Sequence, residues 1–129
     1  MKSELKYVAF SNNKSINELL YYISLWITEF EFIKIELSFL KYLIKTYPFK
    51  SKIPNLFEHL QLFILDLESL EEDRNLILKK IHHQKKQLSN RLKSYDLNYE
   101  NLEEEVFNYL EDYKKLKTRI YQYINGLIK

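Results

Sequence analysis

Apolar residues recur every three or four positions over three long stretches of the chain. In the first stretch they are Ile16, Leu19, Ile23, Trp26, Phe30, Ile33, Leu37, Leu40, Ile44 and Tyr47. In the last stretch they are Tyr99, Leu102, Val106, Tyr109, Tyr113, Leu116, Ile120, Tyr123 and Leu127. A mean spacing of about 3.5 residues predicts long helices that pack nearly parallel or antiparallel to one another.

The middle stretch has the same spacing with polar interruptions. Its apolar positions are Leu56, Leu60, Phe63, Leu67, Leu70, Ile77, Ile81 and Leu88, while Arg74 and Gln84 occupy the positions between them. The polar run 71–75 leaves no apolar face for more than one turn of about 3.6 residues. A break there would give a four-helix bundle. Because the run contains neither Gly nor Pro, we predict one continuous helix instead.

Capping residues predict where the helices begin and end. Ser15 and Glu18 form a capping box at the start of the first helix, and Pro48 disfavours helix in the residue before it. Pro54 suits the first turn of the second helix. Asp96 and Asn98 are expected to interrupt the helix, with Asn98 or Asn101 capping the third.

These boundaries give helices over about 15–47, 54–94 and 98–127. Short connections make consecutive helices antiparallel. We therefore predict an all-α fold, an elongated up-down-up three-helix bundle in one domain over 15–129. Residues 1–14 are expected to form an arm that is poorly ordered or packs on the bundle.

Charge supports the pairing of the second and third helices. Six bases and no acid lie in 79–93, and seven acids and no base lie in 96–112. Folding the chain at the intervening turn brings the two runs together. Further from the turn, the acids of 71–73 are expected opposite Lys117 and Arg119. Exposed pairs contribute at most about 1 kcal/mol each, so their main effect is on register.

The first helix carries a second apolar stripe, roughly 160° from the first on a helical wheel. Its members are Tyr21, Leu25, Thr28, Phe32, Ile35, Phe39 and Tyr42. A simple three-helix bundle cannot bury both stripes. Either a longer or bent second helix or the segment Tyr7–Phe10 covers this stripe, or it binds a second copy or another helical protein. We expect a homodimer through this stripe, since two-fold dimers are the commonest soluble oligomers.

Composition excludes several classes of protein. The chain has 129 residues, one Gly, two Pro and no Cys. So few turn residues argue against a sheet fold, and disulfides and thiolate metal sites are excluded. The longest uncharged run, Leu19–Thr28, is 10 residues. A membrane-spanning helix needs about 20, so we expect a cytoplasmic protein without membrane contact.

No constellation of residues points to catalysis, a cofactor or a metal. His82 and His83 are adjacent, so on a helix they cannot bind one metal ion as an i, i+4 pair would. His59 stands alone, and no Glu-x-x-His repeat for a di-iron site is present. Glu29 and Glu36 lie one heptad apart, where flanking salt bridges are the expected role. We therefore expect a non-enzymatic protein that acts by association.

An alternative function is nucleic-acid binding through the basic stretch. Its bases are Lys79, Lys80, Lys85, Lys86, Arg91 and Lys93. Affinity would come from phosphate neutralisation. The acidic run of the same chain competes for these bases, and the formal net charge is only +2, so we rank this function second.

The segment 25–40 resembles the first helix of a family of small uncharacterised bacterial helical proteins. The resemblance rests on Trp26, Glu29, Glu36 and Leu37. It covers about one helix. It implies a three-helix coiled-coil-like bundle and implies no activity or functional residue.

Overall fold

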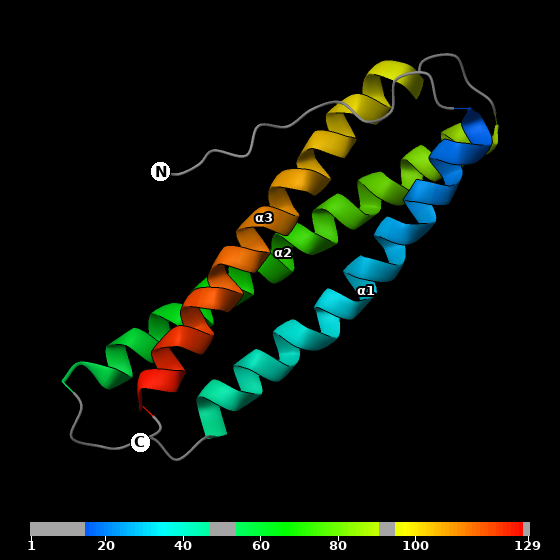
Figure 1. Cartoon of the computed structure of the whole chain (residues 1–129). Coiled ribbons are helices and arrows are strands. Elements are labelled where there is room, and N and C mark those ends of the chain that lie inside the picture. The colour runs from blue at the N-terminus through cyan, green and yellow to red at the C-terminus, as the bar shows by residue number, and fades with distance from the viewer. Residues whose placement is uncertain (1–14, 47–53, 91–94, 128–129) are drawn as a thin grey trace.

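The protein is an all-α bundle of three long helices. The computed structural model describes residues 15–46, 54–90 and 95–127. Helix α1 spans Ile16–Thr46, α2 spans Leu56–Ser89 and α3 spans Tyr95–Leu127. Figure 1 shows three long rods, with α1 and α3 running downward in the view and α2 running upward between them. The predicted three-helix fold is confirmed.

Contacts between distant residues give the direction of each helix. Lys80 of α2 meets Glu105 of α3, and nearer the other end Asp66 meets Arg119, so α2 and α3 are antiparallel. The hydroxyl of Tyr99 donates to the carbonyl of Leu19 at 3.4 Å, whereas Lys117 meets Glu36. Helices α1 and α3 are therefore parallel.

The heptad positions form a single core. Each of the three helices contributes a row of buried residues, and α1 contributes Leu19, Ile23, Phe30, Ile33, Leu37, Leu40 and Ile44. The predicted core positions of α3 from Tyr99 to Ile120 are all buried. In the last turns of α3 the buried residue is Ile124, whereas the sequence pattern predicted Tyr123, which is only partly buried. In α2, Ile64 is buried and Phe63 is only partly so.

Aromatic side chains fill the space between the two parallel helices. Helix α2 packs closely on both neighbours, while the backbones of α1 and α3 approach each other at few points. The rings of Trp26 and Tyr99 are 5.3 Å apart, and those of Phe30 and Tyr109 are 5.1 Å apart. Large rings bridge a distance that Ala or Val could not, which accounts for a helical core rich in Tyr and Phe.

Helix α2 is continuous through the polar run 71–75, so the four-helix alternative is wrong. Arg74 turns into the core with only 4% of its surface exposed, and Glu71 pairs with Lys41 of α1 at 3.3 Å. The run thus keeps an inward-facing residue at its heptad position. Intramolecular contacts replace the missing apolar face.

The helix boundaries differ from the predicted ones by a few residues. The capping box at Ser15 is confirmed: the Ser15 amide donates to Glu18 Oε1 at 2.8 Å, and the Glu18 amide donates to Ser15 Oγ at 3.2 Å. Helix α2 begins after Asn55, which takes a left-handed conformation with φ of 58°. Helix α3 begins at Tyr95, so the expected interruption at Asp96 and Asn98 is wrong. Acidic and amide residues are tolerated in a first turn, where the helix dipole is positive.

The predicted charge pairing holds near the turn but not along the whole hairpin. Lys80 Nζ lies 2.9 Å from Glu105. Glu71 and Lys117, which we expected to face each other, instead pair with Lys41 and Glu36 of α1. Both lie on the flank of their helix that borders α1. The expected arm 1–14 lies outside the described residues, as do residues 91–94.

Candidate protein interface

The second apolar stripe of α1 lies on the surface of the bundle. Six of its seven residues are large hydrophobics with 46–67% of their surface exposed: Tyr21, Leu25, Phe32, Ile35, Phe39 and Tyr42. Thr28 is also exposed. At about 1.5 Å per residue the stripe extends roughly 32 Å along the helix. These residues form one continuous apolar band, which we name the outer face of α1.

The outer face is exposed because α2 and α3 both pack on the opposite side of α1. Phe30, Ile33 and Leu37 point into the core, and the intervening Phe32 and Ile35 point away from it. Coverage by helix 2, one of the alternatives from the sequence, is therefore wrong. Tyr7–Phe10, the other candidate cover within the chain, lies outside the described residues.

Ion pairs on the two flanks of α1 connect this helix to its neighbours. Glu36 accepts a hydrogen bond from Lys117 of α3 at 3.0 Å, and Lys41 donates to Glu71 of α2 at 3.3 Å. The flanking salt bridge expected for Glu36 is confirmed. These pairs hold α1 against α2 and α3 on the side away from its outer face.

The basic stretch is exposed, and one of its members is already paired. Lys79, Lys80, Lys85 and Lys86 lie on the surface of α2. Lys80 donates to both carboxylate oxygens of Glu105, at 3.1 and 2.9 Å. Arg91 and Lys93 lie outside the described residues. Nucleic-acid binding by this stretch stays a prediction.

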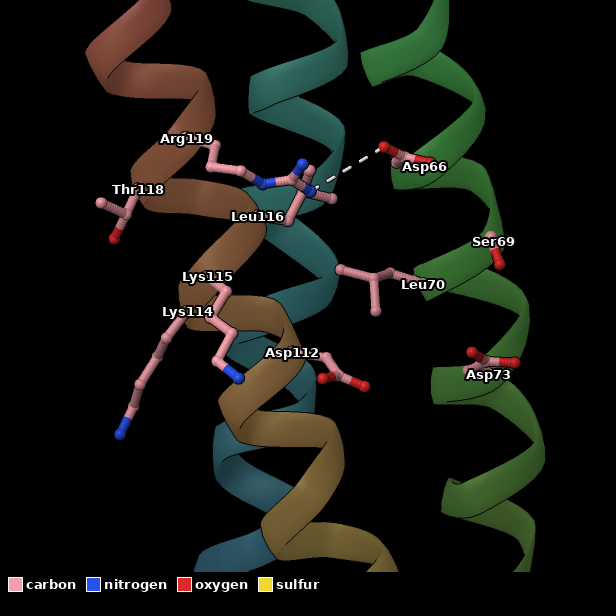
Figure 2. Close-up of a pocket in the computed structure, with 10 residues that line it drawn as sticks. All are labelled: Asp66, Ser69, Leu70, Asp73, Asp112, Lys114, Lys115, Leu116, Thr118 and Arg119. Carbon is pink, nitrogen blue, oxygen red and sulfur yellow. Dashed lines mark ion pairs between the residues drawn. The ribbon is translucent and has the colours of Figure 1, made fainter. Parts of the chain in front are cut away.

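A long groove runs between α2 and α3 in the lower half of the bundle. Figure 2 shows Arg119 of α3 reaching across it toward Asp66 of α2, with a separation of 3.9 Å. The groove has a volume of about 740 Å³, and charges of both signs line it, among them Asp73, Asp112 and Lys115. Such a mixture is typical of a solvated bundle surface and does not select one class of ligand.

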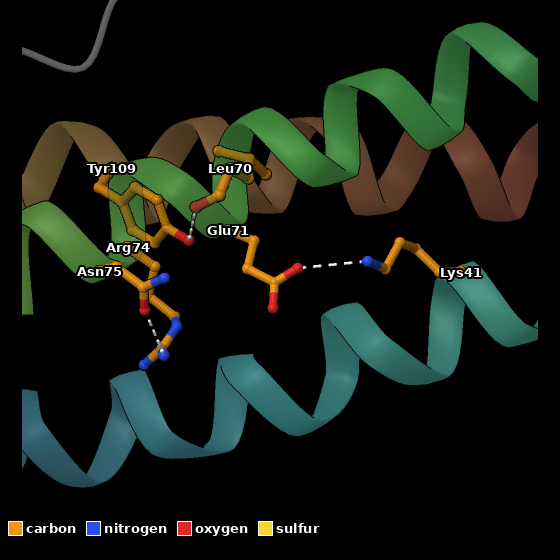
Figure 3. A network of polar contacts seen from close by, with 6 residues as sticks. All are labelled: Lys41, Leu70, Glu71, Arg74, Asn75 and Tyr109. Atoms are coloured by element: carbon orange, nitrogen blue, oxygen red, sulfur yellow. Dashed lines mark hydrogen bonds and ion pairs between the residues drawn. The ribbon is translucent and has the colours of Figure 1, made fainter.

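A buried polar cluster lies at the centre of the bundle, where Arg74 reaches α1. Its Nη1 donates to the backbone carbonyl of Phe30 at 3.1 Å, and its Nη2 donates to Asn75 Oδ1 at 2.8 Å. Figure 3 shows the Arg74 side chain crossing from α2 toward α1, beside the bond from the Tyr109 hydroxyl to the carbonyl of Leu70. Arg74 Nε has no partner among the described residues. The sequence pattern marked Arg74 only as an interruption.

Burial changes the acidity of the core tyrosines. It raises the pKa of Tyr109, an effect that the nearby Arg74 guanidinium opposes. Burial, reinforced by the negative charge of Glu103, also raises the pKa of Tyr99. Both phenols stay protonated at neutral pH and act as hydrogen-bond donors. Both rings pack in the core, and their hydroxyls donate to backbone carbonyls of Leu19 and Leu70.

Near the other end of the bundle, His59 Nδ1 and the Tyr123 hydroxyl are 2.9 Å apart, and Phe63 packs on the same tyrosine ring. Burial raises the pKa of Tyr123. This pair joins the first turns of α2 to the last turns of α3. Within the described ranges, no group of three His, Asp or Glu side chains is arranged to hold a metal ion.

No helix within the described part of the chain has the length and apolar character needed to cross a membrane. Comparison with known proteins found no matching protein-family model, no matching curated protein and no matching solved structure.

Proposed function

We propose that the protein is a non-enzymatic helical bundle that acts by protein–protein association, and that two copies pair through the outer face of α1. The observation that carries the proposal is the exposure of six large apolar side chains in one band. Surface apolar residues normally occur singly, and a contiguous band of this kind marks an interaction site.

The area of the outer face matches that of a specific interface. With whole aromatic side chains of roughly 150–250 Å², the exposed fractions correspond to about 700 Å² of side-chain surface. A stable protein interface covers about 800 Å² on each partner. The band can therefore supply most of one side of a standard interface.

The order of the residues suits a second copy of the same chain. Phe32 is the middle member of the seven, and the stripe begins and ends with Tyr. A two-fold axis near Phe32 with the helices antiparallel places Tyr21 near Tyr42 of the other copy and Leu25 near Phe39. Five of the six large side chains then meet another large apolar side chain, and Ile35 meets the small Thr28, so the band is largely self-complementary about a two-fold axis.

The proposal is tested by the mass of the protein in solution. Sedimentation velocity at about 50 µM should give twice the chain mass of 15.9 kDa. The double variant Phe32→Glu with Phe39→Glu should be a folded monomer. Its dissociation constant should rise at least about 100-fold, since interface aromatics are common hot spots.

A matched control is available on α2. Leu62 and Leu65 are 57% and 59% exposed, comparable with the outer-face residues, but lie on another side of the bundle. The variant Leu62→Glu with Leu65→Glu should remain dimeric. A monomeric parent protein at 50 µM, or equal loss of dimer in both double variants, would contradict the proposal. Circular dichroism of each variant verifies that it is folded.

A further inference from the structure

The C-terminal half of α2 carries a row of exposed basic side chains on the side opposite the core. At about 100° per residue, four of them fall within one sector of roughly 100° on the helix. This sector faces away from the buried Ile81 and Leu88. Its members, which we name the basic stripe of α2, are Lys79, His82, His83 and Lys86. Lys85 is exposed beside them.

Most lysines of this region have no acidic partner in the described part of the chain. Lys80 binds Glu105 of α3. In contrast, Lys79, Lys85 and Lys86 form no ion pair with residues 15–46, 54–90 or 95–127. The acidic run of α3, which we expected to compete for these bases, thus engages one lysine of α2 and leaves three available to an external anion.

The basic stripe is straight and narrow, which suits a linear polyanion. From Lys79 to Lys86 it extends about 10 Å along the helix. Duplex nucleic acid carries one phosphate per about 1.7 Å of its axis, so this length faces roughly six phosphates. The imidazoles of His82 and His83 can donate hydrogen bonds to phosphate oxygens. Contacts of this kind position a protein on a duplex without reading its sequence.

The proposed dimer has two such stripes on one side, an arrangement that rests on the proposed function. A two-fold axis perpendicular to the antiparallel α1 helices carries both copies of α2 to the same side. Because Arg74 meets Phe30 and α2 is antiparallel to α1, the middle of the stripe lies level with residues 21–22 of α1. That level is about 16 Å from Phe32 along the helix. The two stripes are then at least about 32 Å apart, close to one turn of duplex.

We propose that the basic stripe of α2 binds the phosphate backbone of duplex nucleic acid without sequence preference. Lys79 and Lys86 make the central contacts, and Lys85 adds a third positive charge at the border. Backbone neutralisation of this kind gives a Kd of about 1–100 µM at physiological salt. The stripe lies on α2, so a monomer also binds, through one stripe, and a dimer binds through two.

The test is the salt dependence of binding by the full chain, followed by fluorescence anisotropy. The probes are labelled DNA hairpins with stems of about 8 and 20 base pairs, in about 50–200 mM NaCl. Three lysines give a slope of log Kd against log salt of about 3 on the short stem, which reaches one stripe. A dimer gives about 5 on the long stem. Equal slopes of about 3 on both stems support the stripe without a dimer that bridges the duplex, so the two proposals fail separately.

Variants assign the binding to these residues. Lys79→Gln with Lys86→Gln should weaken binding about tenfold or more and lower the slope on the short stem by about 2, since two phosphate contacts are lost. The matched control is Lys34→Gln with Lys45→Gln, which removes the same charge from exposed positions of α1. It should change the Kd by less than about threefold, because distant charges are screened by salt. Circular dichroism verifies that both variants are folded.

Three results would overturn the proposal. One is the absence of binding to either hairpin at about 50 mM salt and 200 µM protein. Another is an equal loss of affinity in the two double variants, which would reduce the effect to net charge. The last is tighter binding to phosphatidylcholine vesicles with about one fifth phosphatidylserine than to the long stem at the same salt, which would assign the stripe to a membrane surface.

Discussion

Replacing Arg74 by Met should stabilise the bundle. The guanidinium is 4% exposed, and the hydrogen bonds seen for it go to two neutral acceptors, the Phe30 carbonyl and the Asn75 side chain. Burying a cation costs several kcal/mol even after relaxation, and neutral acceptors offset only part of this cost. The unpartnered Nε adds to the cost. Met has a similar length and no charge, and it restores the apolar heptad position.

The expected gain in stability from Arg74→Met depends on whether the substitution leaves the two hydrogen-bond acceptors without partners. The Phe30 carbonyl also lies within α1, where the helix provides a backbone partner, and Asn75 is exposed to water, so neither is left unsatisfied by the substitution. Comparable replacements of buried charges have stabilised proteins by about 1–4 kcal/mol. We expect about 1–3 kcal/mol here. With a urea m-value of about 1–3 kcal/mol per M, the unfolding midpoint should rise by roughly 1 M.

The assay is urea unfolding followed by circular dichroism at 222 nm, with all proteins at one concentration because association adds to apparent stability. Arg119→Met, at an exposed position, is the control and should change the free energy of unfolding by less than about 0.5 kcal/mol. If Arg74→Met lowers that free energy by more than about 1 kcal/mol, the two hydrogen bonds outweigh desolvation and the reasoning is refuted. The pKa of Tyr109 should also rise further in the variant, since Arg74 lowers it.

Two more predictions concern pH and helix capping. The raised pKa values of Tyr99 and Tyr109 mean that the unfolded chain loses these protons first, so stability should be intact below pH 10 and fall above it by about 1.4 kcal/mol per pH unit for each tyrosine. Urea unfolding from pH 8 to 11 measures the free energy of unfolding at each pH. If this free energy falls with pH as steeply in Tyr99→Phe as in the parent protein, Tyr99 does not contribute as predicted. Ser15→Ala removes the capping hydroxyl and should cost about 0.5–2 kcal/mol by the same assay, whereas Ser24→Ala in the helix interior should cost little.

The fold could be predicted because α1 and α3 repeat apolar residues with hardly a miss. From Leu19 to Ile44 the predicted row of α1 is buried apart from the partly exposed Trp26, and the capping box at Ser15 has its expected bonds. The second stripe could be predicted for the same reason. Its position on the helix depends only on spacing, and the spacing places it opposite the core.

The polar contacts that α2 makes inside the core could not be predicted from spacing. Periodicity places Arg74 and Gln84 on the inner face but does not tell whether their polar groups find partners there. For Arg74 the partner is a backbone carbonyl 44 residues earlier in the chain, which no local pattern reveals. The start of α3 was misplaced because Asp96 and Asn98 suit either a turn or a first helical turn, and tertiary packing decides between them.

The parallel arrangement of α1 and α3 has a consequence for how the chain is made. The Tyr99 hydroxyl that meets Leu19 is 80 residues further along the chain, and Lys117 follows Glu36 by 81. At a synthesis rate of about 5–20 residues per second, α1 waits roughly 4–16 seconds for its contacts with α3. During that interval only packing against α2 can bury the apolar residues of α1. The growing chain therefore exposes more apolar surface than the folded protein does.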